Sequence, residues 1–299
     1  MEVGIDLSFD SPQVSAISLT PAKKTKYREM IGCLMYATIM TRPDIAFAVS
    51  NLSQYLDAPR TTHLLAVTRV FRYLSGTKDF KLVLGGLNTT IVGYSDSDWA
   101  SQIHRHSISG FAFFVGKGIV SWSSRKQPIV TLSSTEAEYV TLTHSSKDII
   151  WIQKLLNEFS SIFTFSFPTT LYCDNQGAIR LSKDSTFHGR TKHINVHFHF
   201  IRQTVSQGHT TLIYCPTDDM IADTFTKPLA RFKFERFRKL LGVLWSCVIL
   251  EGECCCCMFY FVLFWHWIAI TTRASPPSIS VIYSFHFHYH GLCSSCEHY

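Results

Sequence analysis

The stretch from Ser133 to Tyr139 constrains the fold most, because it combines a helix start with a pair of carboxylates, one of them Glu138. It lies between two short apolar runs, one ending in Asp96 and the other in Asp174. A fourth acid, Asp223, follows much later in the chain. Functional groups of α/β sheets gather at the carboxyl ends of strands. We therefore expect these acids to meet in one metal site that the fold assembles.

The spacing of apolar residues predicts a helical region followed by a mixed α/β region. Helical spacing recurs three times between residues 25 and 84, and the strand period begins near residue 89. The predicted strands cover residues 91–96, 110–115, 119–124, 170–173 and 211–215. The predicted helices cover residues 135–159, a short segment after Gly177, residues 196–205 and a last helix opening at 220–225. This order favours a sheet that combines antiparallel hairpins with parallel crossovers.

Composition limits the class of protein without selecting a function. A chain of 299 residues with 46% hydrophobic and 17% charged residues has room for about two domains and excludes general disorder. The net charge of +6 is compatible with a polyanionic partner and equally with an ordinary basic globular protein.

Cys33, Cys173 and Cys215 lie in apolar contexts and are expected to be reduced core residues. Because residues 1–20 lack a secretory signal, we expect an intracellular protein.

The sequence changes character beyond residue 245. Cysteines, aromatic residues, His and Ser dominate there, and residues 254–270 form a 17-residue apolar run at the lower limit for spanning a bilayer. Four adjacent cysteines, Cys254 to Cys257, lack the paired spacing of a zinc site. We prefer the explanation that this tail is read-through from T-rich, unselected DNA. A membrane anchor is the alternative, and a membrane partner is not expected.

Each acid also has a purely structural explanation. An aspartate after a strand is ordinary turn chemistry, and Asp223 suits the first turn of a helix. Ser133 with Glu136, or Thr135 with Glu138, has capping-box spacing, so one of the two glutamates is enough for the helix start. If the four acids converge, their mutual repulsion calls for a hard divalent cation, and Mg²⁺ is usual where phosphates complete the ligand shell. Spacing alone does not show convergence.

Six ordered strings around the acids carry a family resemblance. They are residues 93–100 (GYSDSDWA), 119–127 (IVSWSSRKQ), 132–139 (LSSTEAEY), 171–176 (LYCDNQ), 190–194 (RTKHI) and 222–229 (ADTFTKPL). Together they resemble the ribonuclease H region of a copia-type LTR retrotransposon Pol polyprotein. Residues 26–32, 41–46 and 73–77 resemble the end of the reverse transcriptase of such an element. The resemblance covers about residues 25 to 244, and the Tyr-x-Asp-Asp motif of the polymerase does not occur.

The resemblance implies an α/β, ribonuclease H-like fold, with a mixed five-stranded sheet flanked by helices and preceded by a small helical module. It implies cleavage of the RNA strand of RNA–DNA hybrids with two Mg²⁺ ions, for which Mn²⁺ can substitute. By motif, the catalytic and metal-binding acids are Asp96, Glu138, Asp174 and Asp223. Glu138 is preferred to Glu136 because an aromatic residue follows it, as at the family position.

Three features depart from the family pattern or leave a choice open. Asp98 is the main rival to Asp96 and is expected to be structural, as part of a copia-specific Asp-Trp pair. The loop 214–219 lacks the mobile His of cellular ribonucleases H, and His188 and His193 are the nearest substitutes in the sequence. Residues 101–106 lack the acidic, double-Arg character usual for the family, which suggests drift in an element no longer under selection.

Basic residues near the predicted cleft are candidates for contacts with substrate phosphates. A hybrid duplex is read by its shape, its backbone charge and the 2′-hydroxyl. For each candidate, a merely solvated charge is an equal alternative. The candidate nucleic-acid-binding residues are Arg125, Lys126, Arg190, Lys192, His193 and Arg202. The other expected partner is the upstream reverse transcriptase domain of the parent polyprotein, and no small-molecule substrate is expected.

The sequence predicts a chain divided into five segments. It comprises a loose leader (1–24), a helical remnant of the reverse transcriptase thumb or connection (25–84), a ribonuclease H-like domain (88–230), a C-terminal helix (231–245) and the tail (246–299). The leading hypothesis is an active hybrid-specific ribonuclease in the cytoplasm, particle-associated in the parent element, or in the nucleus. The alternative is an inactive remnant that keeps the fold and weak nucleic-acid binding. We also expect the helical module to expose apolar surface.

Overall fold

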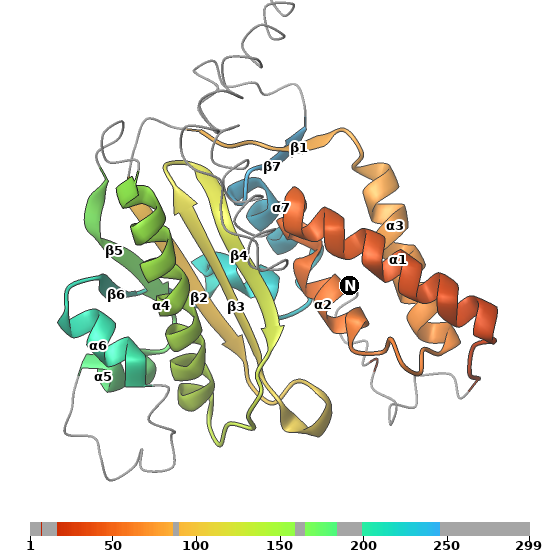
Figure 1. Cartoon of the computed structure of the whole chain (residues 1–299), viewed down its shortest axis with the longest axis horizontal. Helices are drawn as coiled ribbons and strands as arrows, with labels where there is room; N and C mark the ends of the chain where they lie inside the picture. Colours follow the sequence, from red (N-terminus) through yellow and green to blue (C-terminus); the bar gives the residue numbers. More distant parts are fainter. Residues whose placement is uncertain (1–6, 8–16, 86–89, 159–164, 184–198, 246–299) are drawn as a thin grey trace, which may run out of the picture. The chain divides into compact units, whose positions relative to one another are not determined.

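A computed structural model describes residue 7 and residues 17–85, 90–158, 165–183 and 199–245 (Figure 1). One compact unit spans Met1–Glu251. The tail, with its apolar run and clustered cysteines, lies outside the described residues, and so does most of the predicted leader. Within the described part of the chain, no helix is long and apolar enough to cross a membrane.

Three helices form the region that precedes the sheet. They are α1 (Pro21–Met40), α2 (Ala46–Ser53) and α3 (Thr61–Gly76), with a short 3-10 turn, η1 (Pro43–Ile45), before α2. Pro21 starts α1 because a proline at the first helical position needs no N–H partner, so the helix begins inside the predicted leader. Tyr27, Ile31 and Leu34 form the buried stripe of α1. They pack in one cluster with buried residues of α2 and α3.

The main sheet has five strands, β2 (Thr90–Asp98), β3 (Ile108–Val115), β4 (Gly118–Lys126), β5 (Ser166–Cys173) and β6 (Thr210–Tyr214). Their order across the sheet is β4-β3-β2-β5-β6 (Figure 1). The β2–β3 and β3–β4 pairs are antiparallel, whereas β2–β5 and β5–β6 are parallel. The expected α/β, ribonuclease H-like fold with a mixed five-stranded sheet is thereby confirmed.

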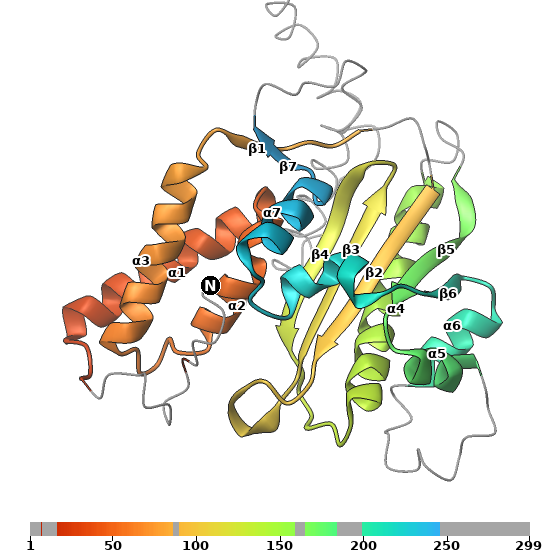
Figure 2. The ribbon, with the colours of Figure 1, turned by 180° about the vertical axis from the view of Figure 1, so that it is seen from behind.

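Helices cover both faces of this sheet. The long helix α4 (Ser134–Glu158) lies across one face, beside α5 (Gln176–Lys183) and α6 (Phe200–Ser206) (Figure 1). The opposite face carries the 3-10 segments η5 (Thr217–Asp219) and η6 (Ile221–Phe225) and the helix α7 (Arg231–Leu240) (Figure 2). Since successive side chains of a strand point to opposite faces, β2 presents alternate residues to α4 and to η6.

A second, two-stranded sheet joins the segment after α3 to the end of the described fold. Strands β1 (Phe80–Leu82) and β7 (Val243–Trp245) pair antiparallel. The predicted helix over 231–245 therefore ends early, at Leu240, and Gly242 with φ 82° allows the turn into β7.

The helical region and the sheet share a hydrophobic core. Ala46 of α2 belongs to the same buried cluster as Ala112, Phe114 and Ile119 of the sheet and Phe237 of α7. The Trp122 Nε1–H also donates to the Thr38 carbonyl at 3.0 Å. The predicted domain boundary between the helical region and the sheet, at residues 84–88, therefore stays a prediction.

Candidate metal centre

The end of strand β2 presents its side chains alternately to the two faces of the sheet. On the α4 face, the Ser145 hydroxyl donates to Ser95 Oγ at 3.3 Å. On the η6 face, the Asp96 carboxylate accepts a hydrogen bond from the Thr226 hydroxyl. Asp96 is 1% exposed, so its carboxylate is buried at the strand end where a ligand site was expected.

The start of α4 gives its two glutamates different roles. The Glu136 N–H donates to Ser133 Oγ at 3.2 Å, and Glu136 Oε2 accepts from the Leu132 N–H at 2.7 Å. Glu136 therefore serves the helix start. Glu138 Oε1 instead accepts from the Ser97 N–H at 2.8 Å and from the Ser97 hydroxyl at 3.0 Å. The end of β2 thus fixes the Glu138 carboxylate in place.

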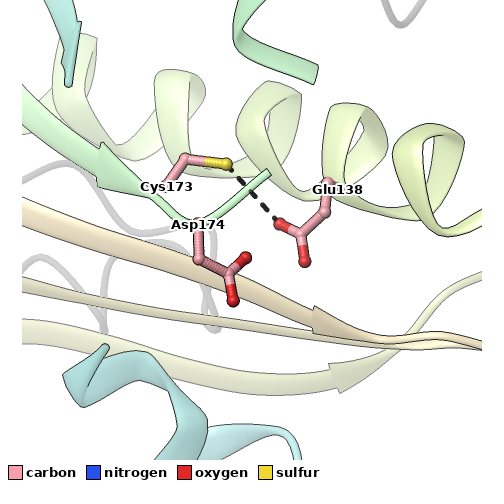
Figure 3. A group of neighbouring side chains, drawn as sticks. All are labelled: Glu138, Cys173 and Asp174. Atoms are coloured by element: carbon pink, nitrogen blue, oxygen red, sulfur yellow. Dashed lines mark hydrogen bonds between the residues drawn. The ribbon is translucent and has the colours of Figure 1, made fainter. Parts of the chain in front are cut away.

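The end of strand β5 brings Asp174 and Cys173 to Glu138. One ligand atom from each of these three residues lies within 4.8 Å of the others (Figure 3). The Cys173 Sγ lies 3.8 Å from Glu138 Oε2, and Asp174 Oδ2 accepts from the Thr217 hydroxyl at 2.8 Å. The sequence predicted Cys173 only as a core residue; it is fully buried, but its thiol also borders the acids.

Asp223 lies in η6 and is held between two lysines. Lys227 Nζ lies 2.9 Å from Asp223 Oδ1, and Lys233 Nζ lies 2.8 Å from Asp223 Oδ2. Lys227 Nζ also lies 3.6 Å from Asp96 Oδ2, so this ammonium bridges two of the four acids. Neither lysine was predicted from the sequence to be part of the site. Their only sequence signal is the position of Lys227 in the string 222–229 and the basic character of α7.

The four acids form one electrostatic cluster. The pKa of Asp96 is raised to about 7, chiefly by burial; the charges of Asp223 and Asp174 contribute to the rise, and Lys227 and Thr226 oppose it. Burial also raises the pKa of Glu138 well above its usual range, and Asp96 and Asp174 add to the rise. These shifts connect Asp96 with each of the other three acids and Glu138 with Asp174, so Asp96 lies at the centre of the cluster.

Asp98 is a weaker candidate than Asp96. It is two residues further along β2, at the end of the strand, and is only half-buried. Burial raises its pKa, while a side-chain hydrogen bond with Ser101 and the charge of Lys227 oppose the rise. Among the other acids, only Asp223 acts on the pKa of Asp98, whereas both Asp223 and Asp174 act on that of Asp96.

The residues present fit a divalent cation. Asp96, Glu138 and Asp174 offer carboxylate oxygens, the hard ligands that Mg²⁺ and Mn²⁺ prefer. Burial, with the charges of neighbouring acids, raises the pKa of Asp96 and of Glu138 and so disfavours their ionised forms. A cation placed among them would favour those forms.

Three of the basic residues predicted to bind nucleic acid are described, and none of them is in a described ion pair with the four acids. Arg125 is exposed on β4 and lies near Asp148, while Lys126 ends the same edge strand. The Arg202 Nε–H donates to the Leu181 carbonyl at 3.0 Å, and Arg202 lines a hollow of about 560 Å³ between α5 and α6 with Lys183. Arg190, Lys192 and His193, like His188, lie outside the described residues.

The loop 214–219, which lacks the histidine of cellular ribonucleases H, connects two of the acids through Thr217. The Thr217 hydroxyl donates to Asp174, and the Thr217 carbonyl accepts from Lys233 Nζ at 2.9 Å. Lys233 in turn contacts Asp223. Thr217 and Lys233 therefore link the acid at the end of β5 to the acid in η6.

Comparisons with known proteins place the chain among retrotransposon sequences. No protein-family model matches. The chain is 42% identical over 222 residues to the retrovirus-related Pol polyprotein from transposon RE2 of Arabidopsis thaliana, a match that covers 74% of this chain and 15% of that protein. It is 41% identical over 221 residues to the corresponding polyprotein from transposon TNT 1-94 of Nicotiana tabacum, which covers 74% of this chain and 16% of the relative.

Among solved structures, the N-terminal RNase H domain of Rv2228c from Mycobacterium tuberculosis, solved as a fusion with maltose-binding protein, is similar over 51% of this chain and 98% of that chain. The TM-score is 0.35 and the sequence identity 11%. The assignment of the fold therefore rests on the strand order described above.

Proposed function

Because the chain belongs to the retrovirus-related Pol polyproteins of copia-type transposons, of which it spans 15–16% of the length, we propose that it hydrolyses the RNA strand of RNA–DNA hybrids. The observation that carries this proposal is the convergence of four acids at the ends of β2 and β5, the start of α4 and η6. The acids come from sequence positions spread over more than a hundred residues, so only a specific fold brings them together.

Asp96, Glu138, Asp174 and Asp223 are the proposed catalytic residues and metal ligands. When bound, two Mg²⁺ or Mn²⁺ ions would supply an activated water and stabilise the leaving oxygen of a phosphodiester. The hydrogen bonds of this chain orient the ligands beforehand. Ser97 fixes Glu138, Thr217 fixes Asp174 and Thr226 fixes Asp96. Such support by neighbouring groups is typical of metal sites in which the ligand geometry matters.

The described candidates for substrate contacts lie on β4 and α6. Arg125, Lys126 and Arg202 are the described candidates for phosphate contacts, and Arg190, Lys192 and His193 are the candidates outside the described residues. Contacts of this kind would bind the sugar–phosphate backbone without reading the base sequence. The further proposed partner is a reverse transcriptase domain, the part of a Pol polyprotein that would produce the hybrid. The cellular compartment stays a prediction.

The test is cleavage of labelled duplexes by the purified full chain in Mg²⁺ or in Mn²⁺. We expect the RNA–DNA hybrid to be cut, and the matching RNA duplex and DNA duplex to stay intact. The variant Asp174→Asn should remove the activity, whereas Asp57→Asn, which changes an exposed acid of the helical region, should not. A well-folded protein that cuts none of the three duplexes would instead support the alternative of an inactive remnant.

A further inference from the structure

The positive charge at the acid cluster is concentrated beside two of the four acids, Asp96 and Asp223. Asp223 has an ammonium at each carboxylate oxygen, with Lys227 at 2.9 Å and Lys233 at 2.8 Å. Lys227 also approaches Asp96 to 3.6 Å. The side chains of Asp96 and Asp223 are 2% and 1% exposed, so the two lysines neutralise carboxylates that water does not reach.

The other half of the cluster has neutral partners. The described hydrogen bonds to Glu138 come from Ser97 and from the Cys173 thiol. The described hydrogen bond to Asp174 comes from the Thr217 hydroxyl. A divalent cation approaching Glu138 and Asp174 therefore meets negative charge that no ammonium among the described ion pairs offsets, whereas a cation approaching Asp96 and Asp223 meets Lys227.

The two lysines differ in how firmly they are held. Lys233 Nζ has a second acceptor, the Thr217 carbonyl, which anchors it independently of Asp223. The described partners of Lys227 Nζ are the two acids themselves. The Lys227 side chain is 31% exposed, and a lysine stem is long and flexible, so its ammonium has an open path into solvent.

We propose that Lys227 is a resident counter-cation that occupies the position of the second divalent ion, so that the two ions bind in order. The first ion binds at Glu138 and Asp174, and the second binds at Asp96 and Asp223 only as the Lys227 ammonium withdraws. This inference rests on the proposed function. Its physical basis is that an ammonium and a divalent ion a few ångströms apart repel each other strongly in a buried site, and both cannot use the same carboxylate oxygens.

The test is a titration of the metal-free full chain with Mn²⁺, followed by calorimetry and by electron paramagnetic resonance of the free ion. The wild type should bind one ion tightly and a second at least about tenfold more weakly. Lys227→Met, which keeps the length of the side chain and removes its charge, should tighten the second ion by about tenfold or more. Lys227→Gln is a second neutral variant with the same expected result.

Two further variants separate this account from a general effect of charge. Lys227→Arg keeps the positive charge and should leave the second ion weak. Lys117→Met removes one positive charge from the exposed turn between β3 and β4, at the end of β3 away from the Asp96–Gly110 pair, and should leave both constants unchanged. In thermal melts, Lys227→Met should be less stable than the wild type without metal and should gain more stability from Mn²⁺.

The outcomes distinguish this inference from the proposed function. Two Mn²⁺ constants that are the same in the wild type, Lys227→Met and Lys227→Gln would overturn the inference and leave the proposed metal centre intact. A wild-type chain that is folded and binds no Mn²⁺ would overturn both.

Discussion

Asp96 in β2 lies directly opposite Gly110 in β3, and the missing side chain of Gly110 is what lets η6 approach Asp96. A Cβ atom at Gly110 would lie 2.6 Å from Thr226 Cγ2 and 2.8 Å from Phe225 Cβ. Thr226 is the residue whose hydroxyl donates to Asp96. The close contact between the acid of β2 and the segment that carries Asp223 therefore depends on a glycine.

The substitution Gly110→Ala should push η6 away from the sheet and separate Asp223 from Asp96. We expect it to weaken Mn²⁺ binding and to lower the free energy of unfolding by about 1–3 kcal/mol, the usual cost of overpacking a core. Urea denaturation and Mn²⁺ titration measure the two effects. Gly32→Ala is the matched control, since a Cβ there meets no atom within 4 Å, and it should leave metal affinity unchanged. Wild-type Mn²⁺ affinity in Gly110→Ala would contradict this explanation.

The stability of the metal-free protein should fall as the pH rises. Burial raises the pKa of Asp96 to about 7, so the folded state holds this proton more tightly than the unfolded state. The stabilising effect is fully present below the unfolded pKa, near 4, and is lost as the pH rises through about 7. Between pH 5 and pH 8 we expect the contribution of Asp96 to fall by roughly 3 kcal/mol.

Urea denaturation of the wild type and of Asp96→Asn at pH 5 and at pH 8 isolates this contribution. The wild type should lose more stability than the variant over that interval, and saturating Mg²⁺ should reduce the difference because a bound cation favours the ionised acid. Equal losses in the two proteins would show that Asp96 titrates normally.

A buried ion pair stabilises the helical region. Arg42 donates from Nε and Nη2 to the two oxygens of Asp44, at 2.9 and 2.8 Å, and the Tyr73 hydroxyl donates to Asp44 Oδ2 at 2.6 Å. Arg42→Ala leaves the Asp44 charge buried without its cation and should cost about 3–5 kcal/mol of stability. Arg231→Ala breaks the exposed pair with Glu235 and is the control, for which we expect no measurable change. Equal effects of the two substitutions would refute the assignment.

The first helix exposes an apolar stripe, as expected for this region from its sequence. Met35, Tyr36 and Ile39 of α1 are 44%, 65% and 45% exposed. Because they lie on one helical face, they form a patch that favours self-association. The double variant Tyr36→Lys/Ile39→Lys should bind less of a hydrophobic dye and elute later from a sizing column than the wild type. A monomeric, dye-silent wild type would show that the stripe has no such effect.

The strands of the main sheet could be predicted because the alternation of their residues is visible within each short segment of sequence. The alternation in residues 91–96 and the Asp after residues 171–173 predicted Asp96 and Asp174 at strand ends; Asp174 directly follows β5, whereas β2 continues two residues past Asp96, to Asp98. Strands β1 and β7 escaped prediction because each has three residues, too few for a period, and their pairing joins Phe80 to Trp245 across most of the chain. Register and pairing of this kind depend on the whole fold.

The roles within the site were harder to predict from the sequence. Capping-box spacing allowed either Glu136 or Glu138 to serve the helix start, and only the hydrogen bonds of Leu132 and Ser97 distinguish them. The lysines at Asp223 escaped notice because η6 and α7 must first fold back across the sheet. Once they do, Lys227 and Lys233 meet an acid that no local pattern connects with them.

We propose that Glu138 belongs to a metal-dependent nuclease centre, while Glu136, two residues earlier, only starts the helix. The most direct test is the initial rate of RNA-strand cleavage in an RNA–DNA hybrid, measured against Mg²⁺ concentration for the wild type, Glu138→Gln and Glu136→Gln. We predict a loss of at least about 100-fold in Glu138→Gln, the scale of losing one electrostatic group in an active site. We predict a change of less than about threefold in Glu136→Gln and a melting temperature near that of the wild type, because the Gln amide oxygen can still accept from the Leu132 N–H. Equal rates in the wild type and Glu138→Gln would contradict the claim.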